Sequence, residues 1–304
     1  MPDKGHNASH YFYVHPTNKP EWTKKLHQKD VDDLLGFDPF TNGKPLINGK
    51  TYLQHFNIPA STANCSFRLT TIYPGMLIGA GYSHYAIKGE GEDSDYQLGF
   101  FFDHTLGVPI IPGSSVKGVL KNVFPIPGKD RTAKLDYVYD LVHKEENKIS
   151  KEYLLVNWEE IFFKNDNVLF HAFPVKREKD NESKNEFEVA KKQFNNSIRN
   201  LEHDNQSLQK KKFDAAELKY KISQRILVDD AITPHPEDIF KEPIPLKFIK
   251  VPADVTFKFQ FKINVYNKDG INLLPEKIGN VFKKILIEFG ICAKRNVGYG
   301  HFRE

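Results

Sequence analysis

The sequence predicts an α+β fold, and two patterns near the C-terminus indicate it most directly. Residues 254–266 (DVTFKFQFKINVY) alternate apolar and polar side chains, as a strand with one buried face does. Residues 273–290 (LLPEKIGNVFKKILIEFG) carry apolar residues three and four positions apart, which is typical of an amphipathic helix. Gly290 follows the last apolar residue of that helix and is a natural C-cap. A closing strand is expected at residues 296–302 (NVGYGHF).

A strand, a helix and a second strand are predicted earlier in the chain. Residues 65–73 (CSFRLTTIY) alternate like a half-buried strand, and residues 166–175 (DNVLFHAFPV) are also strand-like. Between them, Ser114 and Ser115 are candidate N-caps of a helix over residues 114–124. The complete order is strand, helix, strand, strand, helix, strand. This is the ferredoxin-like (RRM-like, split βαβ) arrangement, which many RNA-binding sheets use.

The sequence indicates one domain over residues 1–304 with two additions to the core. Residues 1–63 are rich in turn signals and form an expected N-terminal extension. Residues 64–177 and 225–304 contain the predicted core elements. Residues 178–224 are dominated by charged and amide side chains, so we expect them to form a charged helical insertion.

Composition and charge limit the classes of function. A formal net charge of +4 produces no strong global field, so any nucleic-acid surface must be a local patch. Cys65 and Cys292 are the only cysteines, which excludes a disulfide framework and a cysteine-rich zinc site and fits a reducing compartment. No apolar run approaches the ~20 residues of a membrane span. We therefore expect a soluble, cytoplasmic protein with no membrane partner, no cofactor and no metal site.

The first segment with functional signal is GVPIIPGSSVKGVLKN, residues 107–122. Ser114 and Ser115 lie where a helix is predicted to begin, and Lys117 and Lys121 stand one helical turn apart. Open main-chain N–H groups, the helix dipole, two hydroxyls and two ammonium groups together suit a phosphate. The alternative is an ordinary N-capped helix with two solvated lysines.

The second segment is GICAKRNVGYGHFRE, residues 290–304. Gly298 and Gly300 flank Tyr299, and the run Lys294-Arg295-Asn296 precedes them. Glycines let a main chain approach a ligand closely, cations neutralise phosphate, and an aromatic ring stacks on a base. The alternative is a turn that leads into the last strand.

In this order, the two segments resemble the RAMP superfamily of CRISPR proteins. Its members combine a ferredoxin-like core, a PGSSxKG-type helix start and a glycine-rich loop near the C-terminus. Within it, the chain is most similar to the family of sixth subunits of the Cmr (type III-B) effector complexes. The resemblance covers about half the chain and is carried by FRLTTIYPGMLIGAG (67–81), HTLGVPIIPGSSVKGVLK (104–121), DDAITPHP (229–236), PIPLKFIKVPADVTFKFQF (243–261) and GICAKRNVGYGHF (290–302).

The resemblance implies a non-catalytic subunit that binds CRISPR guide RNA (crRNA) in antiviral defence. Such a subunit caps the RAMP backbone filament near the 3′ end of the guide RNA and contacts other RAMP subunits of the Cmr complex, with target RNA as a further expected partner. Binding is expected to be blind to guide sequence, because phosphates carry no sequence information. The RNA-binding residues it implies are Ser114, Ser115, Lys117, Lys121, Lys294, Arg295, Asn296, Gly298, Tyr299, Gly300 and His235. Arg295 departs from the family pattern, which has a small residue there.

Three other functions stay open at this point. The chain could cut target RNA with a metal-bound aspartate of an acidic loop, as RAMP backbone endoribonucleases do; it could process guide RNA by acid–base catalysis; or it could be a purely structural protein–protein adaptor. The adaptor would need to bury the basic loop 294–296 against protein. The acidic candidates are Glu90, Glu92, Asp93, Asp95 and Asp103, and the histidine candidates are His84, His104, His235 and His301.

Within the insertion, the spacing predicts an amphipathic helix and then a second helix over residues 208–222. A stripe this narrow on so charged a segment stabilises little by itself. We therefore expect it to dock on a neighbouring subunit or to lie across the RNA. The stripe consists of Phe187, Ala190, Phe194, Ile198 and Leu201.

Overall fold

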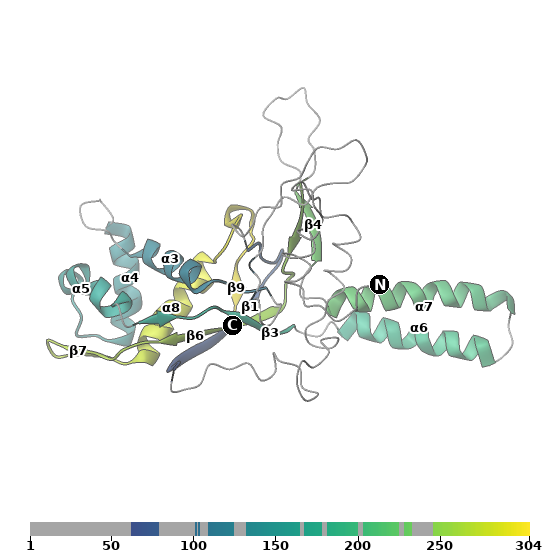
Figure 1. The fold of residues 1–304 in the computed structure, drawn as a ribbon, viewed down its shortest axis with the longest axis horizontal. Helices are drawn as coiled ribbons and strands as arrows, with labels where there is room; N and C mark the ends of the chain where they lie inside the picture. The colour runs from purple at the N-terminus through teal and green to yellow at the C-terminus, as the bar shows by residue number, and fades with distance from the viewer. Residues whose placement is uncertain are drawn as a thin grey trace, which may run out of the picture.

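The computed structural model describes ten segments of the chain, from residue 62 to the C-terminal residue. Nearly all of the predicted N-terminal extension lies outside the described residues. Figure 1 shows a group of helices at one end, a sheet beside them, and long helices at the other end. The described residues are 62–78, 101, 103, 109–124, 132–164, 167–177, 181–199, 203–224, 228–232 and 246–304.

The described part of the core contains a five-stranded antiparallel sheet centred on β6 (Val255–Lys262). One edge of β6 pairs with β1 (Cys65–Thr71), which in turn pairs with β9 (Phe302–Arg303). The other edge of β6 pairs with β2 (Val168–Leu169) and then with β3 (Phe173–Arg177). The fold is therefore a mixed one, in which helices accompany an antiparallel sheet, as the sequence predicts.

Alternation along β6 places its phenyl rings on one face of the sheet. Phe257, Phe259 and Phe261 are all buried. Phe67 of β1 lies opposite Phe259, and the two ring centroids are 5.4 Å apart. This face meets α8 (Pro275–Phe289), where the Phe282 ring lies 5.7 Å from that of Phe261. The predicted strand and helix are confirmed, because their apolar periodicities face each other.

Two helices that the predicted element order omits complete this core. They are α4 (Thr132–Glu145) and α5 (Lys151–Phe163). The Phe124 ring, next to the last residue of α3 (Gly113–Val123), stacks on Trp158 of α5 with centroids 5.1 Å apart. Both helices bury apolar side chains against the common core, among them Val138, Leu141, Val142, Leu154, Ile161, Phe162 and Phe163.

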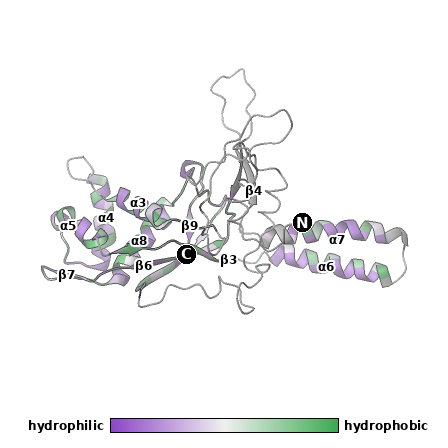
Figure 2. Cartoon of the chain, viewed as in Figure 1, coloured by the Kyte–Doolittle hydropathy of each residue, from purple (hydrophilic) through white to green (hydrophobic). Residues whose placement is uncertain are grey.

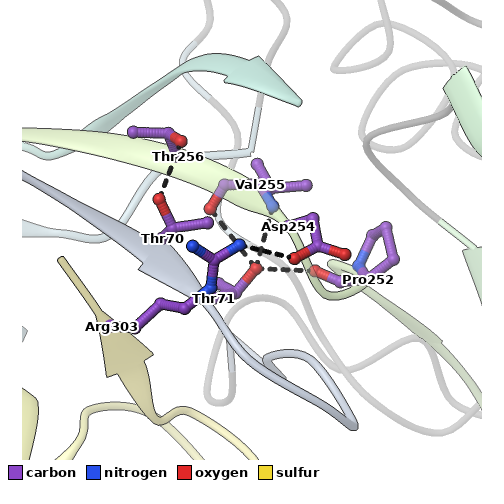
Figure 3. Close-up of polar contacts among 7 residues, drawn as sticks. All are labelled: Thr70, Thr71, Pro252, Asp254, Val255, Thr256 and Arg303. Carbon is purple, nitrogen blue, oxygen red and sulfur yellow. Dashed lines mark hydrogen bonds and ion pairs between the residues drawn. The ribbon is translucent and has the colours of Figure 1, made fainter. Parts of the chain in front are cut away.

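A cluster of hydrogen bonds ties the start of β6 to its neighbours (Figure 3). The Thr71 hydroxyl donates to the Pro252 carbonyl at 2.8 Å and accepts from the Val255 N–H at 3.1 Å. The Thr70 and Thr256 hydroxyls are 2.9 Å apart on paired strands. Arg303 of β9 reaches Asp254 at 3.0 Å. The three strands β1, β6 and β9 are thus joined by side chains as well as by main-chain pairing.

Three strand predictions change in detail. The strand predicted at 166–175 is two strands, β2 and β3. The strand predicted at 254–266 ends at Lys262, and a hairpin of β7 (Tyr266–Lys268) and β8 (Ile271–Leu273) follows. Its turn is Asp269-Gly270, with φ of 54° and 78°, the Asp-Gly pair that two-residue hairpins favour. The strand predicted at 296–302 is only β9, preceded by a 3₁₀ turn over Arg295–Val297.

The charged segment folds into two long helices, α6 (Asn181–Arg199) and α7 (His203–Gln224), that pack on each other. Figure 2 shows both as mainly hydrophilic. The apolar stripe of α6 faces rings of α7: Phe187 stacks on Tyr220 with centroids 5.3 Å apart, and Phe194 on Phe213 at 5.4 Å. Most of the stripe therefore has a partner within the chain, although Ile198 remains 47% exposed.

The described residues also contain a second hairpin. β4 (Val228–Ile232) pairs with β5 (Leu246–Lys250). None of the helices among the described residues combines the length and apolarity that a bilayer crossing requires.

We predict that the core folds without the helical pair, since the rings of α6 and α7 pack on each other. Replacing residues 178–224 with a short Gly/Ser linker should leave one cooperative thermal transition, measured by circular dichroism. It should remove only contacts that the pair makes with other molecules. Loss of the cooperative transition would show instead that these helices belong to the core.

Two glycines of α3 should respond in opposite directions to alanine. A Cβ at Gly113 would overlap the Leu169 carbonyl oxygen, whereas a Cβ at Gly118 meets nothing within 4 Å. We expect Gly113→Ala to lower the free energy of unfolding by about 1–3 kcal/mol. Gly118→Ala should raise it by about 0.5–1 kcal/mol, because Ala loses less chain entropy in a helix. Urea unfolding of both variants tests this, and an unchanged or more stable Gly113→Ala protein would contradict the close packing of α3 on β2.

Candidate nucleic-acid interface

The start of α3 differs by one residue from the sequence prediction. The helix begins at Gly113, its N-cap is Pro112, and no side chain caps it. Ser114 and Ser115 are therefore not N-caps; they are the second and third residues of the first turn. The prediction placed the cap by residue type, whereas the helix begins one residue earlier, at Gly113, which packs directly against β2.

The main-chain N–H groups of this turn have different partners. The Gly113 N–H donates to His171 Nδ1 at 3.0 Å, and the Val116 N–H makes the first intrahelical bond, to the Pro112 carbonyl at 3.1 Å. The amides of Ser114 and Ser115 come before that bond and have no acceptor within the helix. Ser114 is exposed and Ser115 is half-buried. This turn can donate hydrogen bonds to an anion.

The two lysines of α3 lie on the flank that faces α5. Lys121 forms an ion pair with Glu159 at 2.7 Å, and its ammonium lies 5.6 Å from the centre of the Phe163 ring. Both charged side chains are substantially exposed, so the pair contributes at most about 1 kcal/mol. A phosphate could replace Glu159 at little cost. Lys117 lies one turn earlier and is half-buried.

The glycine-rich loop is fastened to the sheet by main-chain hydrogen bonds. The Ile291 N–H donates to the Gly300 carbonyl at 2.8 Å, and the Gly300 N–H donates to the Gly75 carbonyl at 2.9 Å. Gly300 has a φ of 77°, and a Cβ there would overlap the Ile291 carbonyl oxygen. Gly298 also has positive φ, at 93°. The glycines of this loop thus satisfy packing and main-chain conformation.

Tyr299 has a different environment from the one that base stacking needs. Its side chain is only 5% exposed and packs with Leu77 and Ala293. The Lys250 ammonium lies 5.7 Å from the ring centre. In this structure the ring supports the loop. Lys294, Arg295 and Asn296 are exposed on the loop surface.

Arg295 lies on the other flank of α3 from the lysines. One of its guanidinium nitrogens donates to the Phe289 carbonyl at 3.1 Å. The side chain lines a cavity of about 390 Å³ together with Val119 of α3 and Tyr137 of α4. Val119 follows Lys117 by two residues, which is about 200° around a helix. The four predicted cations therefore do not form one continuous patch; α3 separates them into two pairs.

The remaining candidates from the sequence analysis are the acidic residues and the histidines. His235, His84, His104 and the acidic residues from Glu90 to Asp95 lie outside the described residues. Asp103 and His301 are described, and each is half-buried. Among the described residues, no three His, Cys, Asp or Glu side chains gather in a way that could hold a metal ion.

The two cysteines are protonated thiols at neutral pH. Burial, with a smaller contribution from Glu276, raises the pKa of Cys65 to about 11. Burial likewise raises the pKa of Cys292 to about 12. The Cys65 sulfur packs where a Cβ of Gly279 would lie, so its role is close packing of α8 on β1.

Sequence reasoning missed the residues that surround Arg295 and the partner of Gly113. The missed residues come from three different segments: His171 follows β2, Lys134 and Tyr137 belong to α4, and Phe289 ends α8. Each looks like an ordinary core or surface residue in its own segment. Only tertiary packing brings them to the two predicted motifs.

Comparisons with known proteins find matches that include these segments. The family model of the RAMP superfamily matches residues 68–303. The CRISPR system Cmr subunit Cmr6 of Pyrococcus furiosus is 25% identical over 253 residues, which are 72% of this chain and 64% of that protein. The chain therefore spans less than two thirds of the length of that relative.

Two solved structures are also similar, at 18% sequence identity and a TM-score of 0.39. The crystal structure of Cmr6 from Pyrococcus furiosus is matched over 79% of this chain and 97% of that one. A cryo-EM structure of the type III-B Cmr-beta complex bound to cognate target RNA contains a chain matched over 79% of this chain and 58% of its own length.

The match to the family model includes residues 107–122 and nearly all of residues 290–304, and it includes four strands of the central sheet in full and β1 from Arg68 onward. It covers well over half of the chain. The chain belongs to the RAMP superfamily.

Proposed function

We propose that the protein is a non-catalytic, guide-RNA-binding subunit of a type III-B (Cmr) CRISPR effector complex. In this proposal it caps the backbone filament near the 3′ end of the crRNA and acts in antiviral defence. Its partners are the guide RNA, target RNA and other RAMP subunits. Membership of the RAMP superfamily and the likeness to a protein named as a Cmr subunit support this role.

The observation that carries the proposal is the position of the cations around α3. The amides of Ser114 and Ser115, which have no acceptor within the helix, lie at its start. Lys117 and Lys121 follow on one flank, and the exposed Lys294–Asn296 loop lies toward the other. Donors and cations of this kind bind phosphates regardless of base identity. A local patch also suits a chain whose net charge is only +4.

The strand order supports the proposed ferredoxin-like core. With α4 to α7 and the hairpins β4–β5 and β7–β8 left out, the described elements run β1, α3, β2 and β3, β6, α8, β9, and the sheet order is β9, β1, β6, then β2 and β3. Each of the two helices thus connects strands that have a third strand between them. That is the connection expected of a split βαβ arrangement.

The non-catalytic part of the proposal rests on the character of the candidate residues. The acidic candidates are dispersed along the sequence between Glu90 and Asp103, and no candidate histidine has a partner at useful spacing in the sequence. A positioned acid or base needs a partner within hydrogen-bond reach. Phosphate binding needs only the donors and cations described above.

We predict that both cation pairs contribute to RNA binding. Replacing Lys117 and Lys121, or Lys294 and Arg295, with glutamine should weaken binding of a guide-length single-stranded RNA. The slope of log K against log salt should fall by about 0.7 per lost cation. Fluorescence anisotropy between low and high salt measures both quantities.

A matched control uses Lys144→Gln with Lys148→Gln, two exposed lysines near the α4–α5 connection. These changes remove the same charge without touching α3 or the loop. If the control lowers affinity and salt slope as much as the test pairs do, the cations act only through net charge. Unchanged RNA binding in a variant that carries all four glutamine substitutions, at Lys117, Lys121, Lys294 and Arg295, would exclude this surface.

We also predict that the isolated chain does not cleave RNA. Incubation with guide and target RNA in the presence of Mg²⁺ or Mn²⁺ should give no products on a denaturing gel. Cleavage that disappears on replacing Asp93, Asp95 or Asp103 with asparagine would assign the chain to the metal-dependent nucleases instead.

A further inference from the structure

The cavity beside Arg295 has features that phosphate binding alone does not use. It measures about 390 Å³ and lies between the second half of α3, the start of α4 and the end of α8. Its size is near the lower limit of ligand pockets in proteins, which suits one small unit of a polymer. It adjoins the loop that carries Lys294 and Arg295.

Two aromatic rings and two valines form the apolar part of the wall. Tyr137 and Phe289 meet edge to face, with ring centroids 5.2 Å apart, and Val119 and Val123 belong to α3. Phe289 is 37% exposed, an unusual position for a large apolar ring at a helix end. Such a ring can stack on a flat ligand.

Hydrogen bonds hold this wall in place. The Tyr137 hydroxyl donates to a Glu288 carboxylate oxygen at 2.7 Å. Burial and this hydrogen bond raise the pKa of Tyr137, so the hydroxyl stays protonated at neutral pH. The carboxylate of Glu288 is thereby occupied by a donor. The ring of Tyr137 is fixed at both its edge and its hydroxyl.

Cationic and amide groups form the polar part of the same wall. Arg295 uses one nitrogen to bind the Phe289 carbonyl, which orients the guanidinium and leaves other N–H donors for a ligand. The Lys134 ammonium donates to the main-chain carbonyl of Asn122, whose side chain also lines the cavity. Anchored cations beside aromatic rings suit a ligand that is both flat and anionic.

We propose that this cavity binds one nucleotide of single-stranded RNA, with its base against Tyr137 and Phe289 and its phosphate beside Arg295. The inference rests on the proposed RNA-binding function and adds a base site to it. A wholly apolar ligand would leave the two cations unused, and a free phosphate would leave the rings unused. The base must be unpaired to enter, so the site favours single-stranded over duplex RNA.

A cavity-filling variant tests the site without removing a charge. Ala133 is exposed on α4 and lines the cavity, so Ala133→Trp should occupy it with an indole ring. Ala215→Trp, at an exposed alanine of α7, is the matched control. The probe is a guide-length single-stranded RNA, together with copies that carry one abasic site at successive positions. Affinity is measured by fluorescence anisotropy over a range of salt.

We expect Ala133→Trp to weaken RNA binding about tenfold, within the range for loss of one stacked base, with an unchanged salt slope. Ala215→Trp should bind as the unmodified protein does.

One abasic position should weaken binding to the unmodified protein by a similar factor and have no effect on Ala133→Trp, because both changes remove the same contact. The thermal midpoint of each variant is compared, and Phe289→Leu, which keeps the wall apolar, should also lose the abasic effect.

Two results would overturn the base site. The first is unchanged RNA affinity in a folded Ala133→Trp protein; if that variant also loses co-purifying protein subunits, the cavity binds a protein side chain instead. The second is an abasic effect that persists in that variant. The proposed function fails separately, if the unmodified chain shows no salt-dependent RNA binding at all.

Discussion

The antiparallel pairing of β6 positions both halves of the candidate interface. On one edge, β1 leads into Gly75 and Leu77, whose carbonyls accept hydrogen bonds from the glycine-rich loop. On the other edge, β2 supplies the main chain against which the start of α3 packs. A slip of one residue would turn the phenyl rings of β6 away from α8 and move both anchors. The buried rings of β6 therefore determine where the exposed cations lie.

Glycine makes this arrangement possible at the two points where main chains come closest. At Gly113 the first turn of α3 touches the Leu169 carbonyl, and at Gly300 the loop touches the Ile291 carbonyl. A side chain at either point would push α3 from the sheet or open the loop. The two segments with functional signal thus contain residues of two kinds. Gly113 and Gly300 serve packing, whereas Ser114 and the exposed cations are the groups left for a ligand.

The sequence predicted those parts of the fold in which one periodicity dominates. β1, β6 and α8 each have one predominantly apolar face, so alternation or helical spacing located them to within a few residues. α5 gave a weaker signal, because the exposed apolar residues Leu155 and Val156 lie beside its buried stripe of Leu154, Trp158, Ile161 and Phe162. The stripe of α6 was visible, but its partner was not, since the stacking of Phe187 on Tyr220 joins residues that have no local relation. The cations were identified by type, yet their separation by α3 depends on how that helix is turned against the core.

The separation of the two cation pairs by α3 limits the path that a polyanion can take over the surface. A chain of phosphates that reaches both Lys117 and Arg295 must cross α3, because the lysines and Val119 lie on opposite flanks. The start of the helix is the point of crossing at which donors are open, through the amides of Ser114 and Ser115. Glu159 holds Lys121 only through an exposed ion pair, and such a pair gives way readily to a phosphate. A net charge of +4 then suffices, since attraction depends on a short row of anchored donors and cations and not on the field of the whole chain.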